Sequence, residues 1–221
     1  MRRDEKLSIR RRNPEETRRK LMGATVASLF ERGYGGLSTV DVARRARVSR
    51  GGQLHHFPDK QALLAQTVGH LFELRLAELR EKIRDLPDAP PEQRLTAFID
   101  ALWPAFQSPI FYAWLEVVVA SRTDPTVREA GVTLVGRFRG VGPQLFADAL
   151  GPAVAHLPLD YDPLAALVFC NLQAMAINDV ALGAERRFSR TRQARLDALK
   201  TAAALYLRHM IDSAQKLAPG R

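Results

Sequence analysis

The chain has 221 residues, of which 46% are hydrophobic and 26% charged, and its formal net charge is +9 at pH 7. This balance is typical of a globular protein and excludes the disordered and fibrous classes. A single cysteine, Cys170, excludes an internal disulfide, and its apolar neighbours predict a small buried side chain rather than a nucleophile. Because no apolar signal-peptide core follows the basic N-terminus, we expect a cytoplasmic protein.

The positive charge is concentrated in the first quarter of the chain. Residues 1–60 carry 15 Lys and Arg against 7 Asp and Glu, whereas the remaining residues carry 18 against 17. This split predicts a phosphate-binding module joined to a nearly neutral body, with a solvated basic segment as the alternative. Residues 1–13 are rich in Arg and poor in apolar side chains, so we expect a mobile basic arm there.

Capping residues and apolar periodicity predict helices throughout, with no alternation typical of strands. Several helices are expected to begin at an Asn, Ser or Asp followed by proline in the first helical position. The helix from Pro125 is interrupted by Gly136, Gly140, Gly142 and Pro143, which predict that it bends or divides. The predicted helices, in chain order, cover residues 14–32, 39–46, 50–56, 60–84 and 92–106, two that start at 109 and 125, and then residues 162–182 and 189–216.

Residues 38–57 read as two short helices joined by a tight turn, which is the shape of a DNA-reading helix-turn-helix. Leu54 and Phe57 of the second helix are expected to pack in the core, with apolar contacts to DNA as the alternative. Arg47 lies in the turn where a left-handed backbone would favour glycine, at a cost of about 1 to 2 kcal/mol. The helix predicted over 60–84 is the only link to the body, so it is the candidate for carrying a signal.

The last two predicted helices are apolar on broad faces. The stretch 164–182 is interrupted by Asn171, Gln173, Asn178 and Asp179, so we expect a buried or interface helix rather than a membrane span. Together the two helices either complete the core or form a dimer interface. The candidate interface residues are Leu167, Leu172, Met175, Leu196, Leu199, Ala203, Tyr206 and Met210.

The N-terminal module resembles the TetR family of one-component transcriptional regulators over residues 14–65. The resemblance implies a DNA-binding domain over 14–58 and a helical ligand-binding and dimerisation domain over 59–221, after the arm at 1–13. It also implies a C2 homodimer on a roughly palindromic operator, with the two motifs about 34 to 36 Å apart. Arg47 departs from the family, which usually has glycine there. The matching residues are Leu21, Met22, Ala24, Leu29, Phe30, Gly33, Tyr34, Ser38, Thr39, Val42, Ala43, Ala46, Val48, Ser49, Gly51, Leu54, His56, Phe57, Pro58, Lys60, Leu63 and Leu64.

Arg50 begins the second motif helix and is our candidate for a base contact, because a guanidinium can pair with guanine through two hydrogen bonds. A phosphate contact or a solvated charge is the alternative. Gly51 and Gly52 would allow the backbone to approach DNA closely, although a merely flexible helix start is also consistent with them. Gln53 is predicted to bind adenine or a phosphate.

The resemblance implies that Thr39, His56 and Lys60 contact phosphates, and we group His55 with them as a DNA-binding residue. The two histidines are adjacent in sequence, whereas the helical zinc motifs place their histidines four residues apart. We therefore predict no metal site.

Aromatic side chains in the body predict either an apolar pocket for a small-molecule effector or an ordinary core, and the resemblance favours the pocket. We find no catalytic pattern at recognisable spacing and predict neither an enzyme nor a cofactor. The predicted function is a repressor that a small molecule releases from its operator. The alternative is a helical enzyme or ligand carrier with an incidental basic N-terminus. The candidate pocket residues are Phe98, Trp103, Phe106, Phe111, Tyr112, Trp114, Phe138 and Met175.

Overall fold

The computed structural model describes residues 13–182 and 189–217, and nearly all its regular structure is helical, which confirms the all-α class. Apart from Asn13, the expected basic arm lies outside the described residues. A short 3-10 turn, η1, was not predicted. The elements in chain order are α1 (Pro14–Arg32), α2 (Thr39–Arg45), α3 (Arg50–His56), α4 (Lys60–Arg84), α5 (Pro91–Ala105), α6 (Pro109–Ala120), α7 (Pro125–Leu150), η1 (Pro152–Val154), α8 (Asp162–Leu182) and α9 (Ser189–Leu217).

Most predicted helix starts are correct, because side chains satisfy the first backbone N–H groups, which have no partner within a helix. Helix α5 is an exception, since it begins at Pro91 rather than at residue 92 and has no side-chain cap. Asn13 caps α1 through the amide of Glu15, at 3.0 Å. Asp59 caps α4 through the amide of Ala62, at 2.7 Å. Proline follows the cap in α1, α6 and α7, where its missing N–H removes no hydrogen bond.

Contrary to one possibility raised by the sequence, α7 does not divide at its glycines or at Pro143. Leu134, Leu145 and Phe146 lie in the core on either side of these residues. Burial of an apolar helix face outweighs weak local propensity, which explains why the helix continues.

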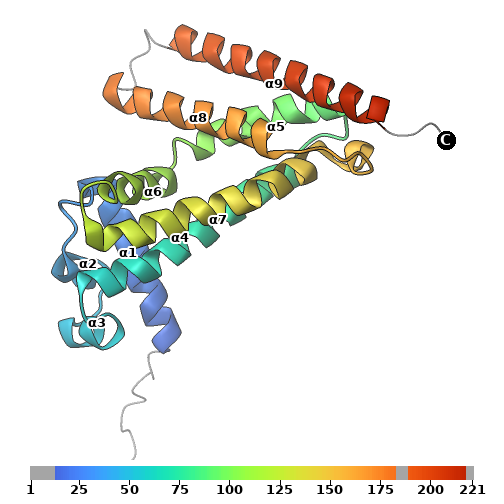
Figure 1. Cartoon of the computed structure of the whole chain (residues 1–221). Helices are drawn as coiled ribbons and strands as arrows, with labels where there is room; N and C mark the ends of the chain where they lie inside the picture. Colours follow the sequence, from blue (N-terminus) through green and yellow to red (C-terminus); the bar gives the residue numbers. More distant parts are fainter. Residues whose placement is uncertain (1–12, 183–188, 218–221) are drawn as a thin grey trace, which may run out of the picture.

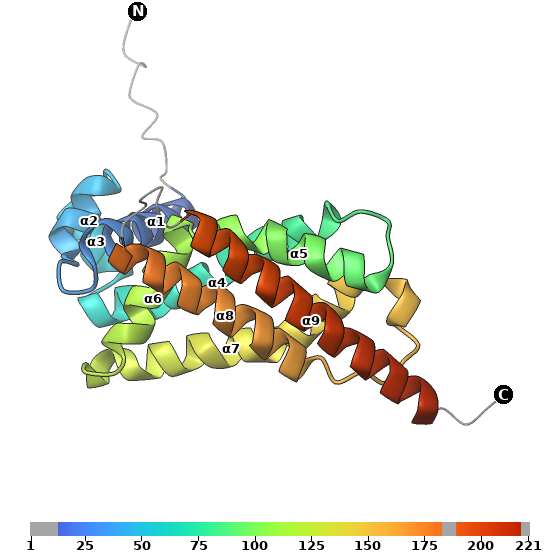
Figure 2. The same cartoon turned by 90° about the horizontal axis from the view of Figure 1, so that it is seen from above.

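The helices form a small N-terminal group and a larger body (Figures 1 and 2). In both views α1, α2 and α3 gather at one end, and α4 runs from this group along α7. Helices α8 and α9 lie side by side on another face, and α9 also packs against α5. One cluster of buried apolar side chains extends from α1 to α9, so the core is shared by both groups.

Three expectations about individual side chains need correction or support. Phe57 is buried as predicted, but Leu54 is 42% exposed, because α3 has only two turns and turns its Gln53 and Phe57 side inward. Phe30 of α1, whose apolar side chain the helix was expected to bury, is 45% exposed and stacks against Tyr112 of α6. Cys170, expected to be buried, is exposed on α8.

The turn between α2 and α3 explains the unusual Arg47. Its φ is +54°, so it adopts the left-handed conformation that glycine usually supplies. The Arg47 amide donates to the Arg44 carbonyl oxygen at 3.1 Å, and the Val48 amide donates to that of Ala43 at 3.0 Å. These two bonds form a Schellman motif, which ends α2 and sets the direction of the chain into α3.

We predict that Arg47→Gly stabilises the protein by about 1 kcal/mol, because relief of the left-handed strain exceeds the added entropy of the unfolded chain. Thermal unfolding followed by circular dichroism should show a rise of about 2 to 4 °C in Tm. Arg44→Gly, in the regular part of α2, should lower the Tm instead. A fall in Tm for Arg47→Gly would show that the turn does not strain this residue.

Candidate functional site

The exposed side of α3 carries several of the predicted DNA-binding residues. Arg50, Gly51 and His55 are exposed, together with Leu54, for which core packing was the favoured expectation. Gly52 and His56 of α3 are partly buried, as are Thr39 at the start of α2 and Lys60 at the start of α4. Apart from Gln53, the predicted set therefore reaches the surface at the end of the molecule formed by α2 and α3 (Figure 1).

Gln53 differs from the prediction because it is fully buried. Its amide donates to the Phe57 carbonyl oxygen at 2.5 Å, and its side-chain oxygen accepts a hydrogen bond from Arg50. The same Arg50 nitrogen donates to the Thr39 hydroxyl at 2.9 Å. In this arrangement Gln53 and Thr39 orient Arg50 at the start of α3, and Gln53 itself does not face solvent.

The two glycines of α3 have different surroundings. A Cβ atom at Gly52 would lie 3.1 Å from the Val48 side chain and 3.2 Å from Ser49, so packing against the turn accounts for this glycine. At Gly51, by contrast, no neighbouring atom lies within 4 Å of the Cβ position. The fold does not require a glycine at 51, which is consistent with close approach of another molecule or with a flexible helix start.

The predicted phosphate contacts have partners within the chain. Lys60 donates to the Tyr34 carbonyl oxygen at 3.2 Å, and its ammonium group lies 4.1 Å from the centre of the Tyr34 ring. Partial burial lowers the pKa of His56, and the neighbouring His55 lowers it further. His56 is therefore biased toward its neutral form at pH 7.

Among the described residues no three His, Cys, Asp or Glu side chains gather as a metal site requires.

Tyr34 joins the N-terminal helices to the body. Its amide donates to a Glu116 carboxylate oxygen on α6 at 2.8 Å, and its hydroxyl donates to Asp124 at 2.6 Å. Asp124 is also the N-cap of α7. Burial and the Asp124 hydrogen bond raise the pKa of the Tyr34 hydroxyl, so it remains a donor at neutral pH. We call Tyr34, Lys60, Glu116 and Asp124 the Tyr34 junction.

Gly33 allows the junction to form. Its φ is +69°, and a Cβ atom there would lie 2.9 Å from a Glu116 carboxylate oxygen. Both the backbone conformation and the approach of Glu116 therefore favour glycine.

The expectation that α4 is the only link between module and body is wrong, because α1 also packs along α6. The sequence pattern identifies only the covalent link between the two parts. The additional contacts of Tyr34 with Glu116 and Asp124 join residues that are 82 and 90 positions apart in the chain.

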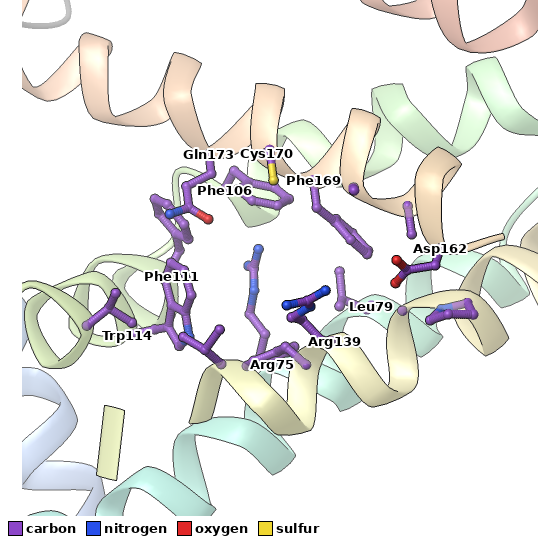
Figure 3. A pocket seen from close by; sticks show the side chains of 17 residues that line it. Arg75, Leu79, Phe106, Phe111, Trp114, Arg139, Asp162, Phe169, Cys170 and Gln173 are labelled. Carbon is purple, nitrogen blue, oxygen red and sulfur yellow. The ribbon is translucent and has the colours of Figure 1, made fainter. Parts of the chain in front are cut away.

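A cavity of about 540 Å³ lies in the body between α4, α6, α7 and α8 (Figure 3). Its volume is in the range of small-molecule sites. Most of its lining is apolar or aromatic, and its charged residues are Arg75, Arg139 and Asp162. The lining consists of Arg75, Leu79, Phe106, Phe111, Trp114, Val118, Val135, Phe138, Arg139, Gly142, Pro143, Asp162, Ala165, Ala166, Phe169, Cys170 and Gln173.

Half of the predicted pocket residues line this cavity: Phe106, Phe111, Trp114 and Phe138. The other four do not. Phe98 is buried and packs edge-on against Phe146, with ring centres 5.5 Å apart. Trp103, Tyr112 and Met175 pack against the core away from the cavity lining. Core and cavity aromatics have the same helical spacing, so the sequence pattern could not separate them.

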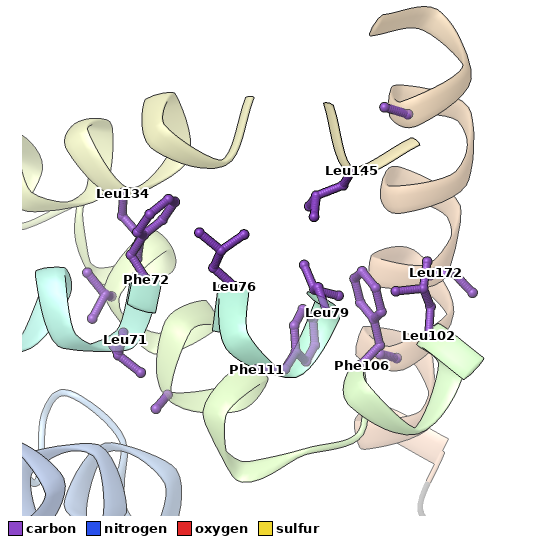
Figure 4. Close-up of a cluster of buried hydrophobic side chains, with 14 of the residues drawn as sticks. Leu71, Phe72, Leu76, Leu79, Leu102, Phe106, Phe111, Leu134, Leu145 and Leu172 are labelled. Carbon is purple, nitrogen blue, oxygen red and sulfur yellow. The ribbon is translucent and has the colours of Figure 1, made fainter. Parts of the chain in front are cut away.

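The cavity lies directly against the packed core of α4. Figure 4 shows Phe72, Leu76 and Leu79 of α4 among leucines of α7, with Phe106 and Phe111 beside them. Leu79, Phe106 and Phe111 belong both to this buried cluster and to the cavity lining. A molecule in the cavity therefore contacts side chains that hold α4 in place.

Arg75 was missed by the sequence reasoning, although it is the most deeply buried charge of the lining. Its side chain leaves α4, and its Nη1 donates to the Ala105 carbonyl oxygen at 2.5 Å and to Glu78 at 3.3 Å. The guanidinium carbon lies 4.4 Å from the centre of the Phe106 ring. Burial lowers the pKa of Arg75 to about 10, and Glu78 opposes this shift, so Arg75 is charged at pH 7.

Five of the candidate interface residues are buried by the chain's own helices. In this arrangement these side chains are not available to contact a second subunit, because they already pack within the core of the chain. They are Leu172, Met175, Leu196, Leu199 and Ala203. Leu167, Tyr206 and Met210 are partly buried. Among the side chains of α8 and α9 whose burial is described, the exposed large apolar ones are Ile177, Val180 and Leu205.

In the described part of the chain, α8 is the one helix that is long and apolar enough to cross a membrane, over Asp162–Val180. Only 33% of this window is buried within the chain. This is weak support for a span, because helices of a soluble core pass the same test, and Leu164 and Val168 of α8 do lie in the core. The partly uncovered apolar face still requires a physical explanation.

Comparison with known proteins agrees with this geometry. The family model described as bacterial regulatory proteins, tetR family, matches residues 21–67. The HTH-type transcriptional regulator CymR of Pseudomonas putida is 30% identical over 182 residues, which cover 82% of this chain and 88% of that protein.

Two solved structures share the fold. A Saccharomonospora viridis transcriptional regulator in complex with choline has a TM-score of 0.61 and 18% identity, covering 88% of this chain and 97% of its own. FadR of Bacillus subtilis in complex with stearoyl-CoA has a TM-score of 0.59 and 14% identity, covering 82% and 96%. The helix-turn-helix, the family match and the extended similarity to CymR show that the chain belongs to the TetR family of DNA-binding transcriptional regulators.

Proposed function

We propose that the protein is a homodimeric repressor that releases its operator when a small molecule occupies the cavity. The domain division is the one expected from the sequence: an arm at 1–13, a DNA-binding domain at 14–58 and an effector and dimerisation domain at 59–221. We assign the protein to the cytoplasm, where operator DNA is accessible. The alternative, an enzyme or carrier with an incidental basic N-terminus, has less support because the relatives are transcriptional regulators.

One observation carries the proposal: three helices that line the cavity also contact the DNA-binding domain through the Tyr34 junction. Helix α4 contributes Lys60, α6 contributes Glu116 and α7 contributes the cap Asp124. On α6, Glu116 lies two residues from both Trp114 and Val118, so it points away from the cavity that they line. A shift of α6 on ligand binding is therefore transmitted to Tyr34.

The direction of coupling follows from differential binding. A ligand shifts the equilibrium only as far as it binds the released arrangement more tightly, typically by 1 to 3 kcal/mol. We propose that the unliganded junction holds α3 in the DNA-binding position and that cavity occupancy displaces it through α4 and α6. Choline and stearoyl-CoA in two structural neighbours support a ligand site in this body, although they differ in charge and size.

For DNA contact we assign base reading to Arg50, close backbone approach to Gly51 and phosphate contacts to His55, His56 and Lys60. Gln53 and Thr39 orient Arg50. In a symmetric dimer the two α3 helices enter successive major grooves about 34 to 36 Å apart, so the operator is roughly palindromic. The exposed face with Ile177, Val180 and Leu205 pairs with the same face of a second subunit.

The test of the proposal is a gel-shift titration on an operator selected from random duplexes. A small molecule that raises the Tm of the free protein should weaken operator binding by about 5- to 150-fold. A ligand that binds tightly and leaves operator affinity unchanged would refute the mechanism.

We predict that Arg50→Ala lowers the preference for operator over random DNA by about ten- to a hundredfold, because a bidentate base contact contributes about 1 to 3 kcal/mol. Fluorescence anisotropy with both duplexes measures the ratio. Arg122→Ala makes the same charge change at an exposed site outside the DNA module and should leave the ratio intact. An equal loss on both duplexes would instead identify Arg50 as a phosphate contact.

We predict that Tyr34→Phe reduces the ligand-induced change in operator affinity several-fold, because it removes the hydrogen bond to Asp124 and keeps the ring. The measurement compares operator Kd with and without a saturating cavity ligand. Tyr112→Phe is the matched control, since the Tyr112 hydroxyl makes no hydrogen bond to a described residue. The junction has no role in coupling if both variants respond as the wild type does.

We predict that Leu205→Glu dissociates the dimer, because a buried unpaired carboxylate is strongly unfavourable in an apolar interface. Sedimentation velocity at micromolar concentration should show a monomer. Val132→Glu, at an equally exposed apolar residue of α7, should remain dimeric. A dimer for both variants would place the interface elsewhere.

A further inference from the structure

We propose that the cavity binds a small organic anion, with a carboxylate or similar monoanionic headgroup on an apolar or aromatic body. The inference rests on the proposed function only in taking this cavity as the effector site. Its basis is the combination of two guanidinium groups with a lining that is otherwise mainly apolar and aromatic.

Arg75 supplies a buried positive charge with unused donors. Its side chain is 5% exposed, and in Figure 3 it stands within the ring of lining residues. Among the described residues only its Nη1 has hydrogen-bond acceptors, which are the Ala105 carbonyl oxygen and Glu78. Nε and Nη2 present the parallel N–H groups that match the two oxygens of a carboxylate.

One further donor group lines the cavity. Arg139 lines the cavity from α7, and neither an ion pair nor a hydrogen bond joins it to any part of the chain that the structure describes. The indole Nε1 of Trp114 has no hydrogen-bond partner among the described residues, but it is buried, so a molecule in the cavity does not reach it.

The remaining walls suit an apolar or aromatic body. Phe106, Phe111 and Phe169 surround the space in Figure 3, and Phe138 also lines it. Rings in contact prefer stacked or edge-on arrangements that add to the burial of apolar area. A hydrophilic anion such as inorganic phosphate leaves these walls without contacts, so the headgroup alone is not the ligand.

The same lining disfavours a cation. A quaternary ammonium group would use the aromatic faces, but it would meet the charges of Arg75 and Arg139 against the single carboxylate of Asp162. Asp162 is exposed at the start of α8, whereas Arg75 is buried. Because charges interact more strongly away from water, Arg75 determines the preferred sign.

Anion binding at Arg75 also acts directly on α4. The Arg75 bond to the Ala105 carbonyl oxygen joins α4 to the C-terminus of α5, and Glu78 competes for the same guanidinium. A ligand carboxylate that engages Arg75 weakens the Glu78 pair and redirects the side chain. The ligand charge is thereby coupled to the helix that begins at Lys60 in the Tyr34 junction.

The first experiment compares matched acids and amides on the full-length protein without DNA. The probes are 2-naphthoate, 4-phenylbutyrate and decanoate, their three uncharged primary amides, and choline, measured by thermal shift and titration calorimetry. We expect at least one acid to bind about ten to a hundred times more tightly than its amide, as a charge-assisted hydrogen-bond pair predicts. Choline should bind more weakly than that acid.

Single substitutions test the contribution of each charged side chain to acid binding. Arg139→Gln should weaken acid binding several-fold and leave amide binding unchanged, whereas Arg128→Gln, an exposed change on the same helix outside the lining, should alter neither. Glu78→Gln removes the competitor for Arg75 and should strengthen acid binding but not amide binding. Since Arg75→Gln removes a buried contact between α4 and α5, Glu78→Gln tests Arg75 without this risk to folding.

The inference is overturned if no acid in the panel binds better than its amide, if choline is preferred, or if Arg139→Gln and Glu78→Gln leave the acid-to-amide ratio unchanged. An acid that binds as expected without altering operator affinity leaves this inference standing. That outcome refutes the proposed release mechanism alone, so the two failures are distinguishable.

Discussion

The packing of α4 is the constraint on which the rest of the structure depends. Its buried side chains, from Leu63 near the DNA-binding helices to Leu79 at the cavity, belong to one continuous core. Apolar burial of this extent resists gradual deformation, so α4 moves as a unit or not at all. A change at the cavity end of the helix consequently has a defined effect at the other end.

The Tyr34 junction couples the body to the DNA-binding domain through more helices than α4 alone. Glu116 and Asp124 reach Tyr34 from α6 and α7, and both helices also line the cavity. The body therefore contacts the DNA-binding domain through several helices whose relative positions a ligand can change. Coupling distributed in this way depends on short polar contacts, which are more easily reorganised than the apolar core.

The position of Arg75 unites packing, charge and signalling in one residue. A buried arginine is costly unless its donors and charge are compensated, and here aromatic rings, a helix C-terminus and Glu78 provide that compensation. This compensation is incomplete, because Nε and Nη2 of Arg75 have no hydrogen-bond acceptor among the described residues. A site that can gain stability from an added anion is thus built into the element that leads to the DNA-binding domain.

Much of this protein follows from local sequence features. The caps Asn13, Asp59 and Asp124 determine where helices begin, and the positive φ of Arg47 follows from the Schellman turn that joins α2 to α3. These depend on neighbours within a few residues, so the chain alone determines them. Only the tertiary structure determined which aromatic side chains line the cavity. It also determined that Gln53 is buried and that Glu116 accepts a hydrogen bond from Tyr34. Such contacts depend on how helices distant in sequence pack together, and periodicity indicates only that a face is buried, not what covers it.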